Sequence, residues 1–194
     1  MAFSAVAFVA FSAMAYTRLS EHDFDQKLRE MGNYLWDLDQ AADLASAHDQ
    51  RGEVERIEAK IQAVGQRAAG FAAIPGSHAL LAAYVAGLAA RMIREWQSAA
   101  GWFQRVVARH PENGDAWLEL TWCLAELQDW PKCIEAARQA TRLYPGASAG
   151  WGNLAMALRS AGDFDGARRA VGRALELDPK DPRNLQLRDE LEAG

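Results

Sequence analysis

The residues that could do chemistry are few and scattered along the chain. Two cysteines, Cys123 and Cys133, and four histidines occur among the 194 residues, and no pair of them has the short spacing of a zinc site. The cysteines are predicted to form one disulfide or two buried thiols. Thiols are favoured because a free cysteine packs as a small hydrophobe. The sequence therefore predicts no metal site and no cofactor.

Two short motifs suggest ligand binding but lack the residues that binding needs. The segment 163–166 begins like a calcium loop, but the remaining oxygen ligands do not follow it. Gly146, Gly150 and Gly152 flank a helix start, with the wrong spacing for a phosphate loop and no strand before them. No nucleophile elbow, Walker loop or zinc-protease motif occurs. The sequence predicts no catalytic residue and no enzyme.

The composition excludes several classes of protein. Half of the residues are hydrophobic and 24% are charged, so the chain can bury a core. Alanine is abundant while valine, isoleucine and threonine are sparse, which favours helices over sheets. The net charge is −5 and no block of Lys and Arg occurs, so nucleic acid is not an expected partner.

The sequence contains an internal repeat, and the repeated elements would position any functional residue. Four columns of small, apolar or proline residues share a period of 34 residues, which predicts an array of repeats. These columns are Pro111, Pro145 and Pro179; Trp96, Trp130 and Phe164; Ala99, Cys133 and Ala167; and Val106, Ala140 and Ala174.

Each repeat is predicted to be a pair of helices. In the unit 148–181, Trp151 and Leu158 fall on one face of a first helix, because helical faces recur every three or four residues. Gly162 ends that helix. The second helix stops before Pro179, because proline lacks a donor and restricts the residue that precedes it.

This pattern resembles the tetratricopeptide repeat (TPR) family. The resemblance implies an all-α fold, a right-handed superhelical solenoid of three repeats within 77–181, closed by a capping helix at 182–194. The units are 80–113, 114–147 and 148–181, and the first has Ala83 where the family prefers Trp. The residues that carry the resemblance are Gly87, Ala99, Phe103, Val106 and Pro111; Trp117, Leu120, Trp130, Cys133, Ala140 and Pro145; and Trp151, Leu154, Ala155, Leu158, Gly162, Ala167, Ala174 and Pro179.

A helical hairpin is predicted at 20–72, before the repeats. Ser20 and Asp23 form a helix start, and apolar residues then recur at spacings of three and four on both sides of a polar turn. The hairpin could be a degenerate repeat, a spacer from a membrane or an N-terminal cap for the solenoid. Ser77 is the expected N-cap of the helix that follows the hairpin.

The first 19 residues predict an apolar helix, interpreted as a membrane anchor. Residues 2–17 carry no charge, although a spanning helix needs ~20 residues. A signal peptide, an in-plane interfacial helix and a helix buried in the fold are the alternatives. Residues expected to face the membrane or a partner helix are Phe3, Phe8, Phe11, Met14, Ala5 and Val9.

In the TPR family the first helix of each unit lines a concave groove that can hold a partner segment. Trp122 is the most informative groove position, because the repeat does not require an aromatic there. It either anchors a partner or packs on the next helix. The predicted groove residues are Tyr84, Leu88, Arg91, Leu118, Glu119, Trp122, Asn153, Met156 and Arg159.

The resemblance also bears on the type of partner. Chaperone-binding members of the family hold a C-terminal carboxylate with Lys, Arg and Asn. The corresponding residues here are Tyr84, Leu88, Glu119, Ala149 and Asn153, and only Asn153 matches. The carboxylate clamp is therefore absent, and no chaperone tail is expected. The apolar first unit predicts a hydrophobic or amphipathic partner segment, or a subunit of a membrane complex.

The sequence thus predicts a non-catalytic protein–protein interaction scaffold, tethered to a membrane by residues 1–17 as a structural or assembly subunit of a larger complex. The alternative is a soluble TPR adaptor or co-chaperone-like peptide-binding module. Arg18, Lys27 and Arg29 follow the apolar run and no basic residue precedes it, which favours the cytoplasmic side for the repeats. A soluble or periplasmic location is the alternative.

Overall fold

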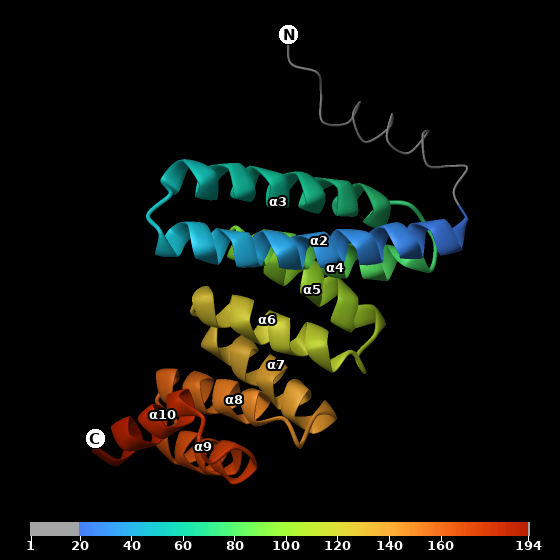
Figure 1. Ribbon diagram of the computed structural model, residues 1–194. Helices are drawn as coiled ribbons and strands as arrows, with labels where there is room; N and C mark the ends of the chain where they lie inside the picture. Colours follow the sequence, from blue (N-terminus) through green and yellow to red (C-terminus); the bar gives the residue numbers. More distant parts are fainter. Residues whose placement is uncertain (1–19, 194) are drawn as a thin grey trace. The chain divides into compact units, whose positions relative to one another are not determined.

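The computed structural model describes residues 20–193, and within that range the chain forms helices joined by short turns, with no strand (Figure 1). The predicted all-α fold is confirmed. The apolar helix predicted at 1–19 lies outside the described residues. None of the described helices combines the length and apolarity that a bilayer span requires. The helices are α2 (Glu21–Ala47), α3 (Arg51–Ala72), α4 (His78–Met92), α5 (Trp96–Arg109), α6 (Gly114–Glu126), α7 (Trp130–Leu143), α8 (Ser148–Ser160), α9 (Phe164–Leu177) and α10 (Pro182–Ala193).

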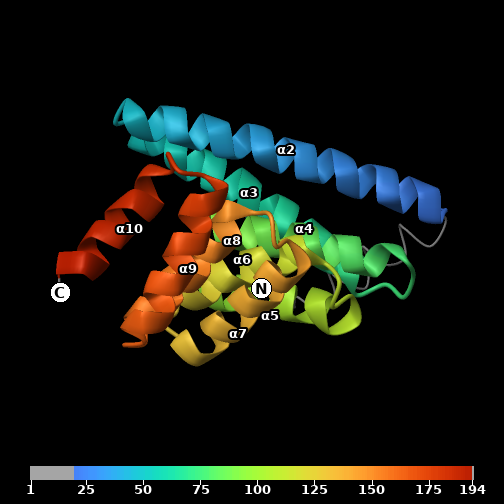
Figure 2. The same ribbon diagram turned by 90° about the horizontal axis from the view of Figure 1, so that it is seen from below.

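The chain divides into two compact units, Met1–Val106 and Val107–Gly194. In the first unit α2 and α3 form a long hairpin, and both of its helices pack against α4. The two views of the ribbon show these three helices side by side (Figures 1 and 2). Trp102 of α5 packs against the core of this bundle. The core consists of Leu35, Leu38, Ala45, Ile57, Ile61, Ala68, Val85, Ala86 and Ala89.

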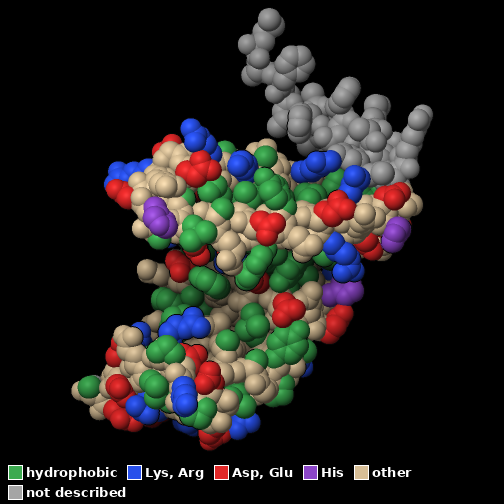
Figure 3. All heavy atoms as spheres, in the orientation of Figure 1, with side chains coloured by type: hydrophobic (Ala, Val, Ile, Leu, Met, Phe, Trp, Pro, Cys, Tyr) green, Lys and Arg blue, Asp and Glu red, His purple; other side chains and the backbone are tan. Residues whose placement is uncertain are grey.

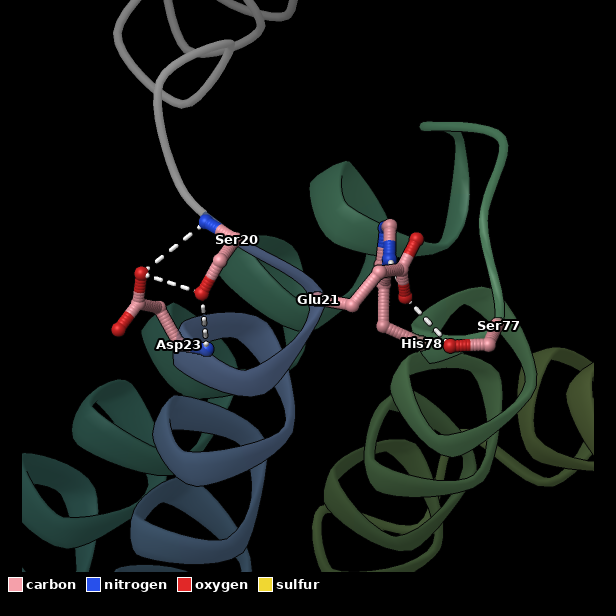
Figure 4. Close-up of polar contacts among 5 residues, drawn as sticks. All are labelled: Ser20, Glu21, Asp23, Ser77 and His78. Carbon is pink, nitrogen blue, oxygen red and sulfur yellow. Dashed lines mark hydrogen bonds and ion pairs between the residues drawn. The ribbon is translucent and has the colours of Figure 1, made fainter.

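The start of α2 is fixed by a reciprocal cap. The Asp23 N–H donates to Ser20 Oγ at 3.2 Å, and the Ser20 N–H donates to Asp23 Oδ2 at 3.0 Å (Figure 4). Two backbone donors that the helix itself leaves without an acceptor are satisfied in this way. The helix start predicted at Ser20 and Asp23 is confirmed.

The start of α4 is capped by a residue far away in the sequence. Ser77 holds the predicted N-cap position, but its hydroxyl makes no hydrogen bond to the helix. The hydroxyl instead donates to the Glu21 carboxylate, and His78 Nδ1 lies 3.3 Å from Glu21 Oε2 (Figure 4). A carboxylate at a helix N-terminus is stabilised by the N–H groups and the helix dipole. Glu21 therefore ties the first turn of α2 to the first turn of α4.

An aromatic stack supports this tie. His78 is 1% exposed, and its ring stacks on Phe24 with centroids 4.1 Å apart. Phe71, at the end of α3, packs edge-on against Phe24 at 5.4 Å. A Cβ on Gly76 would lie 2.5 Å from the His78 ring and 2.6 Å from Glu21 Oε1, so only glycine leaves room for the stack.

One turn geometry recurs between paired helices in both units. Asp49, Arg94, Gln128 and Gly162 all have positive φ, at 53°, 60°, 56° and 85°. In each turn the next residue donates its N–H to a carbonyl five residues back, at 2.9, 2.8, 3.0 and 2.9 Å, which is the Schellman closure of a helix. The α2–α3 hairpin therefore turns in the same way as the repeats.

In the second unit each helix packs on the next, and α8 also contacts α6 and α10. Cys133 and Ala167, which belong to the small column predicted from the period, are both fully buried. The apolar core of α8, α9 and α10 consists of Ala137, Leu154, Ala155, Leu158, Ala167, Ala170, Val171, Leu187 and Leu191.

The Glu21 cap predicts a pH-dependent stability. The hydrogen bond from Ser77, and then that from His78, hold the pKa of the Glu21 carboxyl below its ordinary value. A carboxyl whose pKa is depressed by folding adds stability above its unfolded pKa of about 4.3 and loses it as the pH falls through the folded pKa. We expect Glu21→Gln to lower the urea midpoint at pH 7, and the difference from wild type to shrink below about pH 4.

The matched control for this prediction is Glu58→Gln, an exposed carboxyl on α3. It should leave the urea midpoint unchanged at both pH values. A Glu21→Gln difference that stayed constant down to pH 3 would show that the charge of Glu21 is not what stabilises the fold.

The turn at Gly162 predicts a second effect. An L-residue in the left-handed region costs roughly 1–2 kcal/mol, so Gly162→Ala is expected to lower the free energy of unfolding by about 1 kcal/mol. Gly172 lies in the middle of α9, and a Cβ added there would meet no other atom within 4 Å. Gly172→Ala should raise the free energy of unfolding by up to about 1 kcal/mol, because alanine is the better helix former. Chemical denaturation of both variants checks the pair, and equal shifts would contradict the argument.

Candidate functional site

The second unit presents α6 and α8, the first helices of two consecutive repeats, side by side. Each is tied to the turn before it by the same contact. Trp117 Nε1 donates to the Pro111 carbonyl at 2.9 Å, and Trp151 Nε1 donates to the Pro145 carbonyl at 3.0 Å. From the sequence, these prolines are predicted only as helix ends. The sequence signal for this bond is a tryptophan six residues after a proline, which occurs at the start of both repeats.

The predicted groove residues fall into two sets. Tyr84, Leu88 and Arg91 belong to the first unit, where each is partly buried, and Tyr84 packs edge-on against Phe103 at 5.6 Å. Leu88 packs against the core of the hairpin and α4. The other six residues lie in the second unit. They are Leu118, Glu119 and Trp122 on α6, and Asn153, Met156 and Arg159 on α8.

Two large apolar side chains of this second set are exposed to solvent. Trp122 is 50% exposed and Met156 is 37% exposed. They are 34 residues apart, so they hold the same position in consecutive repeats, on helices that contact each other. Trp122 Nε1 lies 3.4 Å from Glu126 Oε1. About half of the Trp122 side chain therefore stays in contact with solvent.

The charged side chains of α6 are all acidic. The helix carries Asp115, Glu119 and Glu126 and contains no Lys or Arg. The basic residue of α8, Arg159, forms an ion pair with Glu190 of α10. Hydrogen bonds from Gln186 and then from Arg159 hold the pKa of Glu190 below its ordinary value. Arg159 is therefore already neutralised within the unit.

Helix α10 occupies the place that the first helix of another repeat would take. Asn184 is 4% exposed, and a Cβ on Gly152 would lie 2.4 Å from its Oδ1. Asn184 Nδ2 also lies 3.3 Å from Ser148 Oγ. No sequence pattern predicts a role for Asn184. The signal was Gly152, which leaves α8 without a side chain at a position that faces its neighbour.

The remaining chemistry of the unit is structural. Cys123 and Cys133 are buried thiols rather than a disulfide. Burial raises the pKa of Cys133 to about 11, so this thiol stays protonated near neutral pH and is a poor nucleophile. Asp163 accepts the Gly166 N–H at 2.8 Å and caps α9, which accounts for the calcium-like motif. In residues 20–193 no three His, Cys, Asp or Glu side chains gather as metal ligands.

A pocket of about 480 Å³ lies where the α8–α9 turn meets α10. Its cations already have acceptors in the fold. Arg168 donates to the Leu191 carbonyl at 3.1 and 2.8 Å and lies 3.2 Å from Asp165, while Arg159 pairs with Glu190. These bonds hold α10 against the last repeat, so the pocket is a feature of this packing.

Comparisons with known proteins agree with this architecture. Two family models, both described as tetratricopeptide repeat, match residues 84–148 and 148–181. Among curated proteins none matches. The similarity to solved TPR structures confirms the predicted solenoid fold.

Three solved structures illustrate the likeness. The TPR domain of Arabidopsis OM64 is 15% identical with a TM-score of 0.57, over 59% of this chain and 95% of that one. The second TPR domain of human RPAP3, solved with the HSP70 peptide SGPTIEEVD, is 15% identical with a TM-score of 0.53, over 55% and 88%. The MamA double mutant of RS-1 is 14% identical with a TM-score of 0.60, over 84% of both chains. At these identities the likeness is one of fold.

Proposed function

We propose, because residues 84–181 are tetratricopeptide repeats, that this protein is a non-catalytic scaffold that binds a hydrophobic or amphipathic segment of a partner protein. The observation that carries the proposal is the exposure of Trp122 and Met156 at equivalent positions of α6 and α8. The repeat packs without an aromatic there. A partner that covered both side chains would remove apolar area from water and use tryptophan as an anchor.

The charge of α6 restricts the partner. The HSP70 peptide bound by the human RPAP3 domain contains two glutamates and ends in aspartate. Asp115 and Glu126 of α6 would repel such a tail, and α6 offers no Lys or Arg to hold it. An apolar segment with neutral or basic flanks fits this face better, and a chaperone tail of the carboxylate-clamp type does not.

The binding face can be tested without knowing the natural partner. Peptides selected from a random dodecapeptide library on the full-length protein should share a large apolar residue. Trp122→Ala should weaken their binding at least ~10-fold, because an aromatic anchor contributes most of the energy of a small interface. Isothermal titration calorimetry measures the change, and Tyr34→Ala, which removes an exposed aromatic side chain of α2, is the matched control.

Binding that survives Trp122→Ala unchanged would contradict the α6–α8 assignment. Weakening by Tyr34→Ala alone would move the ligand to the first unit.

The proposal also includes a membrane tether. Residues 2–17 carry no charged side chain, which supports an anchor near the ~20-residue length of a spanning helix. Arg18, Lys27 and Arg29 follow this run, which supports a cytoplasmic location for the repeats. Together these features support a structural or assembly subunit of a membrane complex. The competing function is a soluble adaptor that uses the same groove.

Carbonate extraction of membranes separates these two functions. The full chain should remain in the pellet, and a version that begins at Thr17 should be released. If the full chain is also released, the tether is wrong and the soluble adaptor remains. The effect of Trp122→Ala on peptide binding does not depend on this outcome.

A further inference from the structure

The two most exposed large hydrophobic side chains in residues 20–193 lie far along the sequence from the proposed groove. Trp36 is 62% exposed and Leu44 is 63% exposed, both on α2 in the first unit. The packing of the hairpin does not use them, because Leu35, Leu38 and Ala45 supply the buried side of α2. Their exposure therefore calls for a reason other than folding.

These side chains form a continuous face, which we call the Trp36–Leu44 face. Because α2 is a regular helix, residues three, four, seven and eight positions apart share one side. All members of the face are exposed, and the distance from Trp36 to Leu44 along the axis is about 12 Å at 1.5 Å per residue. The face consists of Trp36, Asp37, Gln40, Asp43, Leu44 and Ala47.

The acidic excess of the chain is concentrated around this face. Residues 30–50 contain five of the 26 acidic residues and none of the 21 basic ones, so the rest of the chain carries 21 of each. Figure 3 shows hydrophobic, acidic and basic side chains intermingled on the visible side of the first unit. In the described part of the chain, no Lys or Arg forms an ion pair with Asp37 or Asp43.

We propose that the Trp36–Leu44 face docks a basic amphipathic helix of a partner protein. Aliphatic side chains of that helix would pack on Trp36 and Leu44, and its Lys or Arg residues would pair with Asp37 and Asp43. A cation can also rest on the indole of Trp36. A helix is the favoured partner because side chains at spacings of four and eight match the ridges and grooves of a second helix.

A membrane surface and a second copy of the chain could also cover an exposed apolar stripe. The aspartates of this face oppose both. Helices that lie on membranes surround their apolar side with Lys and Arg, whereas Asp37 and Asp43 would face an anionic lipid surface here. A second copy of the chain would place aspartates against aspartates, and like charges at an interface are costly. A cationic protein segment satisfies both the apolar and the acidic residues.

This surface is separate from the groove on α6 and α8, and the proposal does not depend on the function of that groove. It gives the protein two protein-binding faces, one in each compact unit.

The probe is a labelled synthetic helical peptide with a leucine stripe flanked by lysines, beside a matched peptide in which glutamate replaces each lysine. Fluorescence anisotropy with the full-length protein should show binding of the lysine peptide only, weakened by added NaCl. Trp36→Ala and the double variant Asp37→Lys with Asp43→Lys should each weaken binding at least ~10-fold. The factor of affinity lost with Trp36→Ala should be the same, within about twofold, when Trp122→Ala is also present, because the two faces lie in different compact units.

Three results would overturn the proposal. The first is equal binding of the two peptides, which would remove the charge argument. The second is an affinity for the lysine peptide that Trp36→Ala leaves unchanged. The third is a loss of binding with Trp122→Ala instead, which would place the peptide in the groove. The substituted residues are exposed, and unchanged circular dichroism and urea midpoints of the variants separate lost binding from lost folding.

Discussion

Close approach between neighbouring helices is the constraint on which the rest of the structure depends. Ala99, Cys133 and Ala167 hold one position in three repeats and are fully buried. In the hairpin region a Cβ on Gly65 would lie 2.9 Å from the Cβ of Ala89. Larger side chains at such positions would push the helices apart, because protein interiors have no space to absorb them. The period of small residues is therefore the main determinant of the spacing between helices.

That spacing carries through to the binding face, because each element of a solenoid is positioned by its neighbours. The turns at Gln128 and Gly162 reverse the chain in the same way, with closing hydrogen bonds of 3.0 and 2.9 Å. The indoles of Trp117 and Trp151 tie the starts of α6 and α8 to the preceding prolines. Equal turns and equal ties place Trp122 and Met156 at equivalent points of adjacent helices.

The sequence predicts the parts of the fold that depend on local patterns. Helices, their ends at prolines and the turn at Gly162 follow from periodicity and from residue preferences. The same left-handed turn at Arg94 and Gln128 has no such signal, because neither residue prefers positive φ and the surrounding packing imposes it. The hydrogen bonds that Glu21 accepts from Ser77 and His78 join residues 56 and 57 positions apart. No spacing rule connects such distant residues.

The sequence predicts which positions of the repeat form the candidate site, but it does not predict which of these positions share one surface. Leu88, Trp122 and Met156 share one place in the repeat, and all three are large and apolar, yet only the last two lie in the same compact unit. Periodic positions are constrained by packing, so their residues say little about a partner. The residues that vary between repeats, such as Trp122, carry that information, because the fold tolerates many side chains there.

The first helix of the hairpin, α2, also carries outward residues that the packing of the fold does not require. The hairpin turn at Asp49 has the geometry of the turns in the repeats, while α2, with 27 residues, is about twice as long as α6 or α8, with 13 each. The buried side of α2 completes the core against α4. Its outer side faces none of the described helices of the first unit, so the packing of those helices does not select the residues there. A helix that served only as an end cap would carry a polar outer face, as α10 does. The combination of tryptophan, leucine and aspartates on α2 fits a contact surface instead.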